Sequence, residues 1–174
     1  MQGRHNAAKV VALGSGMAEL RPHIDSFKRV TAECPLPPAV ELIGEKWAVL
    51  IIRGAVMGLR HFEEFQAGLG IARNILSDRL TKLVAGGVLD RRHDPLDRRK
   101  VVYRLTRRGE ALLPVLVALR QWGEEWGNGG CHLIERRNGK PIQRLRVRGD
   151  DGRELGIEDI VWIEDDGEMI LPHF

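Results

Sequence analysis

The stretch ARNILSDRLTKL, residues 72–83, gathers hydrogen-bonding side chains on one side of a predicted helix. Its apolar residues recur every three or four positions, as on the buried side of an amphipathic helix: Ala72, Leu76, Leu80 and Leu83. The opposite side carries side chains with donors and acceptors at several reaches: Arg73, Asn74, Ser77 and Asp78. Arginine and asparagine can each make paired hydrogen bonds to the edge of a nucleic-acid base. The stretch therefore predicts a base-reading surface, although an ordinary solvated helix has the same periodicity.

The segments before this helix predict a helix-turn-helix. Residues 37–44, 46–58 and 61–69 each have a short helical pattern, and glycines end the third of these helices as well as the one at 72–85. The second pattern has four residues at core spacing: Trp47, Leu50, Ile51 and Ala55. Two helices joined by a short glycine-containing turn form the helix-turn-helix, whose second helix can enter a DNA major groove.

A basic hairpin is predicted to follow. Residues 88–92 and 100–105 are rich in β-forming side chains and flank a polar centre. Between residues 91 and 108 lie eight basic residues against two acidic ones, a net charge of +6. Arginines on such a protruding loop, here Arg98 and Arg99, suit phosphate contacts or insertion into a narrow minor groove. A solvated loop with incidental charge is the alternative interpretation.

The last predicted helix begins after Thr106, a suitable N-cap. Five apolar residues along it are spaced three or four apart, as in a coiled-coil seam: Leu112, Val115, Leu119, Trp122 and Trp126. The two tryptophans indicate a large buried contact, so we interpret this series as a dimerisation seam that pairs with a second subunit. Packing within one domain would use the same spacing. Pro114 lies near the helix start, where its missing N–H can bend the axis.

Composition and charge favour a globular, polyanion-binding chain. The 174 residues, 43% of them hydrophobic, suit one domain plus an appendage. The net charge of +3 conceals a gradient, because residues 149–174 carry −8 and the residues before them +11. A basic body attracts nucleic acid, whereas the acidic end is repelled by it. Two widely separated cysteines, no signal peptide and no membrane-length apolar stretch indicate the cytoplasm and no membrane partner.

Three segments resemble the HxlR family of bacterial winged-helix transcription regulators. They are CPLPPAVELIGEKWAVLIIRG, LSDRLTKLVAGGVLDR and VVYRLTRRGEALLPVLVALRQWGEEW, and the resemblance covers roughly residues 34–126. Its motifs are specific in combination: Cys-Pro, Ile-Gly-x-Lys-Trp, Leu-Ser-x-Arg-Leu and Tyr-x-Leu-Thr. The resemblance implies a homodimer that places one recognition helix per subunit in successive major grooves of an operator. It also implies a cytoplasmic, nucleoid-associated regulator, commonly a repressor that responds to an oxidant, an electrophile or a small metabolite.

The resemblance further implies that the recognition helix supplies the DNA contacts from Arg73, Asn74, Ser77, Asp78 and Arg79. Of these, Arg79 is expected nearer the DNA backbone than the bases. Three residues depart from the family pattern. Ala72 stands where a capping serine is usual, Glu45 replaces the second glycine of Gly-Gly-Lys-Trp, and Asp78 replaces a commonly neutral residue.

Cys34 occupies the position of the sensing thiol in redox-responsive members of the family. A nearby helix N-terminus, expected around Pro37, would favour its thiolate form. The resemblance therefore makes Cys34 a redox-sensing candidate, with a buried structural thiol as the alternative. Cys131 could serve as a resolving partner, but no spacing argument brings the two together.

The chain divides into three predicted segments. Residues 1–33 form an N-terminal extension, partly disordered or an artefact of the start site, since Met17 could be the natural start. Residues 34–127 form the winged helix-turn-helix domain, and residues 128–174 form an acidic β-hairpin or meander with three turn-forming glycine pairs. Cys131 and His132 lack the partners of a zinc site.

The predicted fold class is α+β: a winged helix-turn-helix with a C-terminal dimerisation helix and a small β-rich tail. No residue pattern of an enzyme, a cofactor site or a metal site is found. The predicted partners are double-stranded DNA, a second copy of the chain and an oxidant or small-molecule effector. A winged-helix adaptor that binds protein without reading DNA sequence is the competing function.

Overall fold

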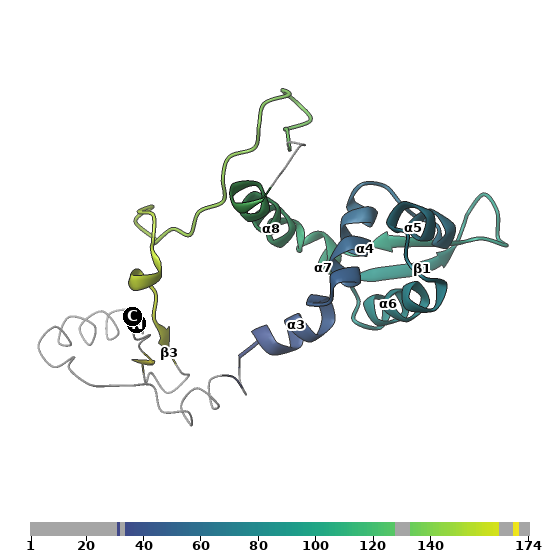
Figure 1. Ribbon diagram of the computed structural model, residues 1–174, viewed down its shortest axis with the longest axis horizontal. Helices are drawn as coiled ribbons and strands as arrows, with labels where there is room; N and C mark the ends of the chain where they lie inside the picture. The colour runs from purple at the N-terminus through teal and green to yellow at the C-terminus, as the bar shows by residue number, and fades with distance from the viewer. Residues whose placement is uncertain (1–30, 32–33, 128–132, 164–168, 171–174) are drawn as a thin grey trace, which may run out of the picture. The chain divides into compact units, whose positions relative to one another are not determined.

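The computed structural model describes residues 31, 34–127, 133–163 and 169–170, which belong to two compact units. The larger unit, residues 35–146, holds six helices and one hairpin (Figure 1): α3 (Leu36–Ile43), α4 (Lys46–Val56), α5 (Phe62–Leu69), α6 (Arg73–Ala85), β1 (Leu89–His93), β2 (Val101–Leu105), α7 (Arg107–Glu110) and α8 (Leu113–Trp126). In the other unit, the short helix η2 (Ile157–Asp159) precedes an antiparallel pair, β3 (Trp162–Ile163) and β4 (Met169–Ile170). The predicted α+β winged helix-turn-helix is confirmed.

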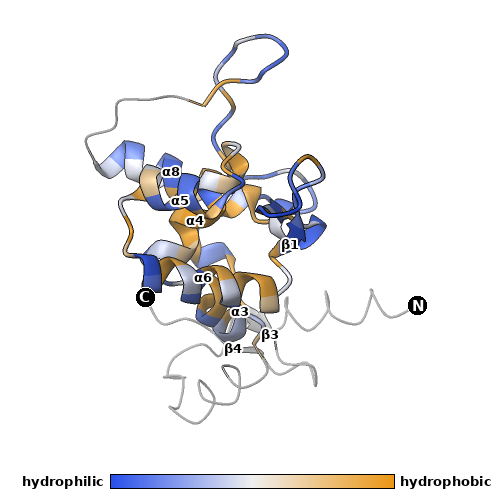
Figure 2. Ribbon diagram, turned by 90° about the vertical axis from the view of Figure 1, so that its right-hand side faces the viewer, coloured by the Kyte–Doolittle hydropathy of each residue, from blue (hydrophilic) through white to orange (hydrophobic). Residues whose placement is uncertain are grey.

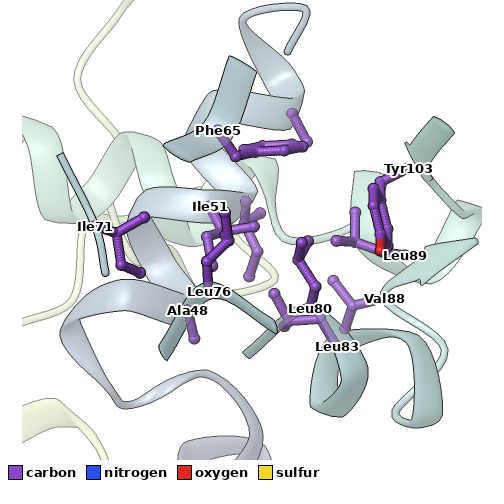
Figure 3. Close-up of a cluster of buried hydrophobic side chains, with 12 residues drawn as sticks. Ala48, Ile51, Phe65, Ile71, Leu76, Leu80, Leu83, Val88, Leu89 and Tyr103 are labelled. Carbon is purple, nitrogen blue, oxygen red and sulfur yellow. The ribbon is translucent and has the colours of Figure 1, made fainter. Parts of the chain in front are cut away.

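One hydrophobic core joins α4, α5, α6 and the hairpin. Three leucines of α6 are at most 1% exposed, and they meet α4 on one side and the start of β1 on the other (Figure 3): Leu76, Leu80 and Leu83. Phe65 of α5 packs edge-on against Tyr103 of β2, with ring centroids 6.5 Å apart. Each fully buried large side chain contributes about 1.5–3 kcal/mol, so this core fixes the orientation of α6.

The buried face of α4 is rotated from the predicted one. Ile51 and Ala55 are buried as expected, but Ala48 and Ile52 replace Trp47 and Leu50, which are only half-buried. The reason is that α4 packs against α5, α6 and β2 together, so its covered stripe is set by three neighbours rather than by its own periodicity. Trp47 instead lies at the edge of the core, with the Lys46 ammonium 4.5 Å from its ring centroid.

The predicted buried position of Ala72 is wrong. Ala72 is the exposed N-cap of α6 and has extended backbone angles. It therefore lies before the first helical residue and is not part of the buried side of α6. Ile71 is buried in the core instead. Gly70, which ends α5 with a φ of +59°, supplies the left-handed turn between the two helices, a conformation that glycine adopts without a side-chain clash.

The predicted single helix after Thr106 is two helices. The Thr106 hydroxyl accepts a hydrogen bond from the Gly109 N–H (3.1 Å) and caps α7, as expected. The chain then breaks at Ala111 and restarts as α8, with Pro114 in the first turn. In one continuous helix the residue at 114 would donate to the Glu110 carbonyl, which proline cannot do.

Candidate nucleic-acid interface

The exposed side of α6 presents all four predicted base-reading side chains: Arg73, Asn74, Ser77 and Asp78. They are exposed because the leucines of the same helix face the core. Within the described part of the chain, the Asn74 amide has no hydrogen-bond partner. Its donor and acceptor are therefore available to an external group such as an adenine edge.

Arg73 is held at the N-terminal end of α6 by an aromatic ring. Its guanidinium carbon lies 4.9 Å from the centroid of Phe62, the first residue of α5. Such cation–π contacts contribute about 0.5–1 kcal/mol at exposed sites. The N-terminal end is where helix-turn-helix recognition helices present base-contacting residues. Phe62 is thus a positioning residue that the sequence did not identify, because an aromatic residue at a helix start is typical of ordinary core packing.

Arg79, predicted to lie near the DNA backbone, is engaged within the protein. Its guanidinium pairs with Glu45, the residue before α4, and with Asp78 at 2.8 Å. Asp78 also lies 3.5 Å from the Lys82 ammonium. The Arg79 side chain is 17% exposed. Two carboxylates therefore offset the positive charge of the middle of α6.

The loop between β1 and β2 is ordered by its own aspartates. The Asp94 carboxylate accepts from the Leu96 N–H (2.8 Å), and Asp97 accepts from the Arg99 N–H (3.1 Å). A backbone bond from Lys100 to the Asp97 carbonyl (2.8 Å) closes the loop. These turns leave Arg98 and Arg99 exposed at a loop that projects beyond α5 and α6 (Figure 1).

The basic residues of the hairpin and its flank have few carboxylate partners. Of the eight between residues 91 and 108, only Arg92 forms an ion pair with a described residue, namely Asp90. The remaining seven are exposed: Arg91, Arg98, Arg99, Lys100, Arg104, Arg107 and Arg108. Figure 2 shows the loop as mainly hydrophilic. Exposed guanidinium groups without internal carboxylates favour phosphate as a partner.

Two consecutive residues connect the hairpin loop to the recognition helix. His61 forms a β-bridge with Val102, donates from Nδ1 to the Val101 carbonyl (3.1 Å) and places Nε2 3.5 Å from the Asp94 carboxylate. The ring of its neighbour Phe62 makes the cation–π contact with the Arg73 guanidinium. At the start of α5, His61 thus contacts the β1–β2 hairpin with its loop, which we call the wing, and Phe62 contacts Arg73, the first residue of α6. No sequence pattern predicts this connection, because the residues that form it are far apart in the chain.

The predicted dimerisation seam is largely uncovered in one chain. Leu112 packs against the core, whereas the other four seam residues are 42–74% exposed: Val115, Leu119, Trp122 and Trp126. The helix α8 buries no residue. An apolar stripe of this size on a single helix is typical of a surface that another helix covers.

The other predicted features lie near or outside the described residues. Cys34 is half-buried, is not in a disulfide, and precedes α3, whose N-cap is Pro35. Cys131 and His132 lie outside the described residues. Residues 133–146 belong to the larger unit. There the Gln121 side chain of α8 donates to the Gln143 carbonyl (3.0 Å) and accepts from the Leu145 N–H (2.8 Å).

No helix in the described part of the chain has the length and apolar character of a bilayer-spanning segment.

Comparisons with known proteins identify the same architecture. A sequence model described as HxlR-like helix-turn-helix matches residues 42–130. HTH-type transcriptional regulator Rv3095 of Mycobacterium tuberculosis is 41% identical over 105 residues, which are 60% of this chain and 62% of that protein. The match therefore spans less than two thirds of that relative. YvaP of Bacillus subtilis, also an HTH-type transcriptional regulator, is 34% identical over 95 residues, 53% of this chain and 88% of YvaP.

A solved structure extends the similarity beyond the matched domain. The crystal structure of the transcription factor candidate PA1607 aligns with a TM-score of 0.73 and 42% sequence identity. The alignment covers 79% of this chain and 99% of that one. It therefore includes more of this chain than residues 42–130.

Proposed function

This chain belongs to the HxlR-like helix-turn-helix family of transcription regulators, and from that membership we propose that it binds a specific DNA operator as a homodimer in the bacterial cytoplasm. In this proposal residues 34–127 act as the DNA-binding domain. Repression of the regulated gene is the proposed sign of regulation, as the family resemblance of the sequence implies.

The proposed base contacts are made by the exposed side of α6. Arg73 and Asn74 have the side chains that bond guanine and adenine edges in pairs, and Ser77 bonds at shorter reach. Asp78 accepts from cytosine or orients a neighbouring cation, since its carboxylate would be repelled by phosphate. Arg98 and Arg99 of the wing contact the backbone and supply affinity without sequence choice.

The observation that carries this proposal is the double contact at the start of α5. Because His61 touches the wing and Phe62 supports Arg73, the two candidate DNA-binding elements are fixed to adjacent residues. A DNA reader needs its helix and wing in one fixed register to contact groove and backbone together. An adaptor that binds protein through this fold has no such requirement.

Dimerisation through α8 is proposed from the exposed seam. Two recognition helices must lie about 34 Å apart to occupy successive major grooves, and a contact between the C-terminal helices of two subunits sets that distance. The seam residues are available in one chain, and two of them are tryptophans, which contribute large contact areas to interfaces.

A response of this regulator to an oxidant or electrophile is proposed through Cys34. The residue directly precedes Pro35, the N-cap of α3, and it occupies the position at which the family resemblance places a sensing thiol. Operator affinity measured before and after mild peroxide, in the wild type and in Cys34→Ser, tests this. Unchanged affinity of a protein whose Cys34 is oxidised by mass spectrometry would assign this thiol a structural role.

The experiment that tests the DNA-binding function selects binding sites from genomic fragments and measures affinity by fluorescence anisotropy at increasing salt. If a dimer neutralises roughly six to ten phosphates, affinity falls by about three to five decades between 50 and 200 mM salt. Arg98→Ala with Arg99→Ala should weaken binding to all duplexes alike. Arg73→Ala should cost about 1–3 kcal/mol at the selected site only.

The matched control is Arg136→Ala, which removes an exposed arginine outside the α6 and wing surfaces. Its affinities for the selected site and for nonspecific duplex should both equal those of the wild type. Binding that does not respond to salt, or equal effects of the helix and wing variants on all sequences, would favour the adaptor function instead.

A further inference from the structure

The helix α8 has a second apolar face besides the seam. At 100° per residue, its centre lies roughly 130° around the helix from the centre of the seam. Its members are Leu113, Leu116 and Val117, with Arg120 among them, and Leu119 of the seam lies at its edge. This face is directed toward α4 rather than away from it. A contact that covers the seam therefore shares Leu119 with this face but leaves Leu113 and Val117, on the other side of the helix, uncovered.

The facing side of α4 is also apolar. The residues that α4 turns away from the core include Val49, Val56 and the neighbouring Met57, with Arg53 between them. Together the two helices, with Leu133 from the following segment, enclose a groove of about 540 Å³. Small-molecule sites typically have volumes of about 300–1,000 Å³, mostly apolar walls and a few polar groups. The groove has these properties.

The charged groups of the groove are both arginines, and they differ in their partners. Arg120 is paired with Glu124 on the same helix at 2.5 Å, so its charge is offset. Arg53 forms no ion pair with any described residue. The groove therefore combines a hydrophobic surface with one guanidinium that no carboxylate of the described residues offsets. A ligand that fits both must be apolar with an anionic end.

We propose that the groove between α4 and α8 binds a small amphipathic organic anion, such as an aromatic carboxylate or sulfonate. The apolar body lies against the valine and leucine side chains, and the anionic group pairs with Arg53. A charge-assisted bond at the edge of an apolar surface is stronger than the same bond in open water. A neutral ligand of the same shape lacks this contact.

The position of the groove indicates that its ligand regulates DNA binding, an inference that rests on the function proposed above. On its opposite side α4 packs against α6, while α8 carries the seam. A ligand wedged between them changes the angle between the DNA-reading helix and the dimer contact. That angle sets the distance between recognition helices, so binding in the groove alters operator affinity without touching a base-reading residue.

The test uses two fluorescent probes with similar aromatic bodies, the sulfonate 8-anilinonaphthalene-1-sulfonate and the uncharged N-phenyl-1-naphthylamine. Full-length protein is titrated with each probe in the absence of DNA. We expect the fluorescence titration with the sulfonate to saturate at one site per chain. Arg53→Gln should weaken sulfonate binding about tenfold, the loss expected for one bond to a charged group. Arg53→Lys should retain most of it.

The uncharged probe and a second arginine provide the controls. Arg53→Gln should not change binding of the uncharged probe, and Arg136→Gln, outside the groove, should change neither. Arg53 is exposed, so its replacement leaves the core intact, and unchanged thermal unfolding verifies this. If neither probe binds the wild type, the groove is covered, as by a second copy, and the proposal is overturned. Equal loss of both probes in Arg53→Gln also overturns it.

Duplex binding is measured separately on the same preparations without probe. Loss of duplex binding there contradicts the proposed function and leaves the ligand result unaffected. Saturating sulfonate should change operator affinity of the wild type but not of Arg53→Gln. If the wild type binds the probe and its operator affinity is unchanged, the regulatory role of the groove is wrong.

Discussion

Arg79, in the middle of α6, forms an ion pair with Glu45, the residue that precedes α4. Asp78 contacts the same guanidinium at 2.8 Å. A DNA phosphate that approaches Arg79 must therefore compete with two carboxylates of the protein. Glu45, which the family resemblance places at a glycine position, thus contacts the candidate DNA-binding surface.

Glu45→Gln should release Arg79 to a phosphate. We expect tighter nonspecific duplex binding and a log–log salt dependence steeper by about one charge. The free energy of unfolding should fall by less than about 1 kcal/mol, because the pair is partly exposed. Anisotropy titrations across a salt series and urea unfolding measure the two effects. An unchanged salt slope would mean that Arg79 does not reach DNA.

Phe62→Leu should relax sequence choice at the base pair that Arg73 reads. Leucine keeps the apolar contact but has no ring face, so the guanidinium loses about 0.5–1 kcal/mol of support. Competition between the selected operator and single-base variants measures the loss. In the Arg73→Ala background the same change should have no further effect, since the contact is already absent. Additive losses would show that Phe62 acts elsewhere.

Leu119→Asp should convert the dimer to monomers, because it places a carboxylate in the apolar seam. Leu119 is 51% exposed in one chain, so the fold itself should persist. Sedimentation velocity and circular dichroism measure assembly and folding. The matched control is Leu96→Asp at the wing loop, where the leucine is 97% exposed and outside the seam. A wild type that sediments as a monomer would refute this assembly.

Glu64→Gln should destabilise the protein at neutral pH but not in acid. Backbone N–H bonds from Arg60 (2.6 Å) and His61 (3.0 Å) lower the pKa of Glu64 from its ordinary value of 4.5. A lowered pKa means that the charged form stabilises the fold above pH 4.5, and that this contribution disappears as the pH falls below it. We expect a loss of about 0.3–1 kcal/mol at neutral pH. Urea midpoints of both proteins should converge in acid, and a constant difference would contradict this cause.

Removal of residues 149–174 should strengthen nonspecific DNA binding at low salt. The deletion takes a charge of −8 from a chain whose remainder carries +11, so repulsion of the polyanion decreases. Duplex affinity of the truncated and full chains, compared at two salt concentrations, measures this. The difference should vanish at high salt, where such long-range charges are screened. Equal affinities at low salt would exclude an electrostatic role for the tail.

The sequence predicted the elements of the interface better than the contacts between them. The leucine periodicity of α6 and the β-rich arms of the hairpin predicted both candidate DNA-binding elements, because each pattern lies within one element. The support of Arg73 by Phe62 and the pairing of Arg79 with Glu45 join separate elements, and no period in the sequence encodes them. The rotated face of α4 has the same origin, since its three packing partners come from distant parts of the chain.

The ordered wing loop has a consequence for the entropy of binding. Fixing one residue of a flexible backbone costs about 1–2 kcal/mol, and the aspartate turns and the His61 contact have already fixed residues 94–100 in the free protein. If the wing contacts DNA as proposed, binding therefore orders only the arginine side chains. A flexible loop with the same charges would lose part of its electrostatic gain to this ordering but would adapt to more DNA shapes. The aspartate turns of this wing thus favour higher affinity for DNA of one groove geometry and lower affinity for DNA of other shapes.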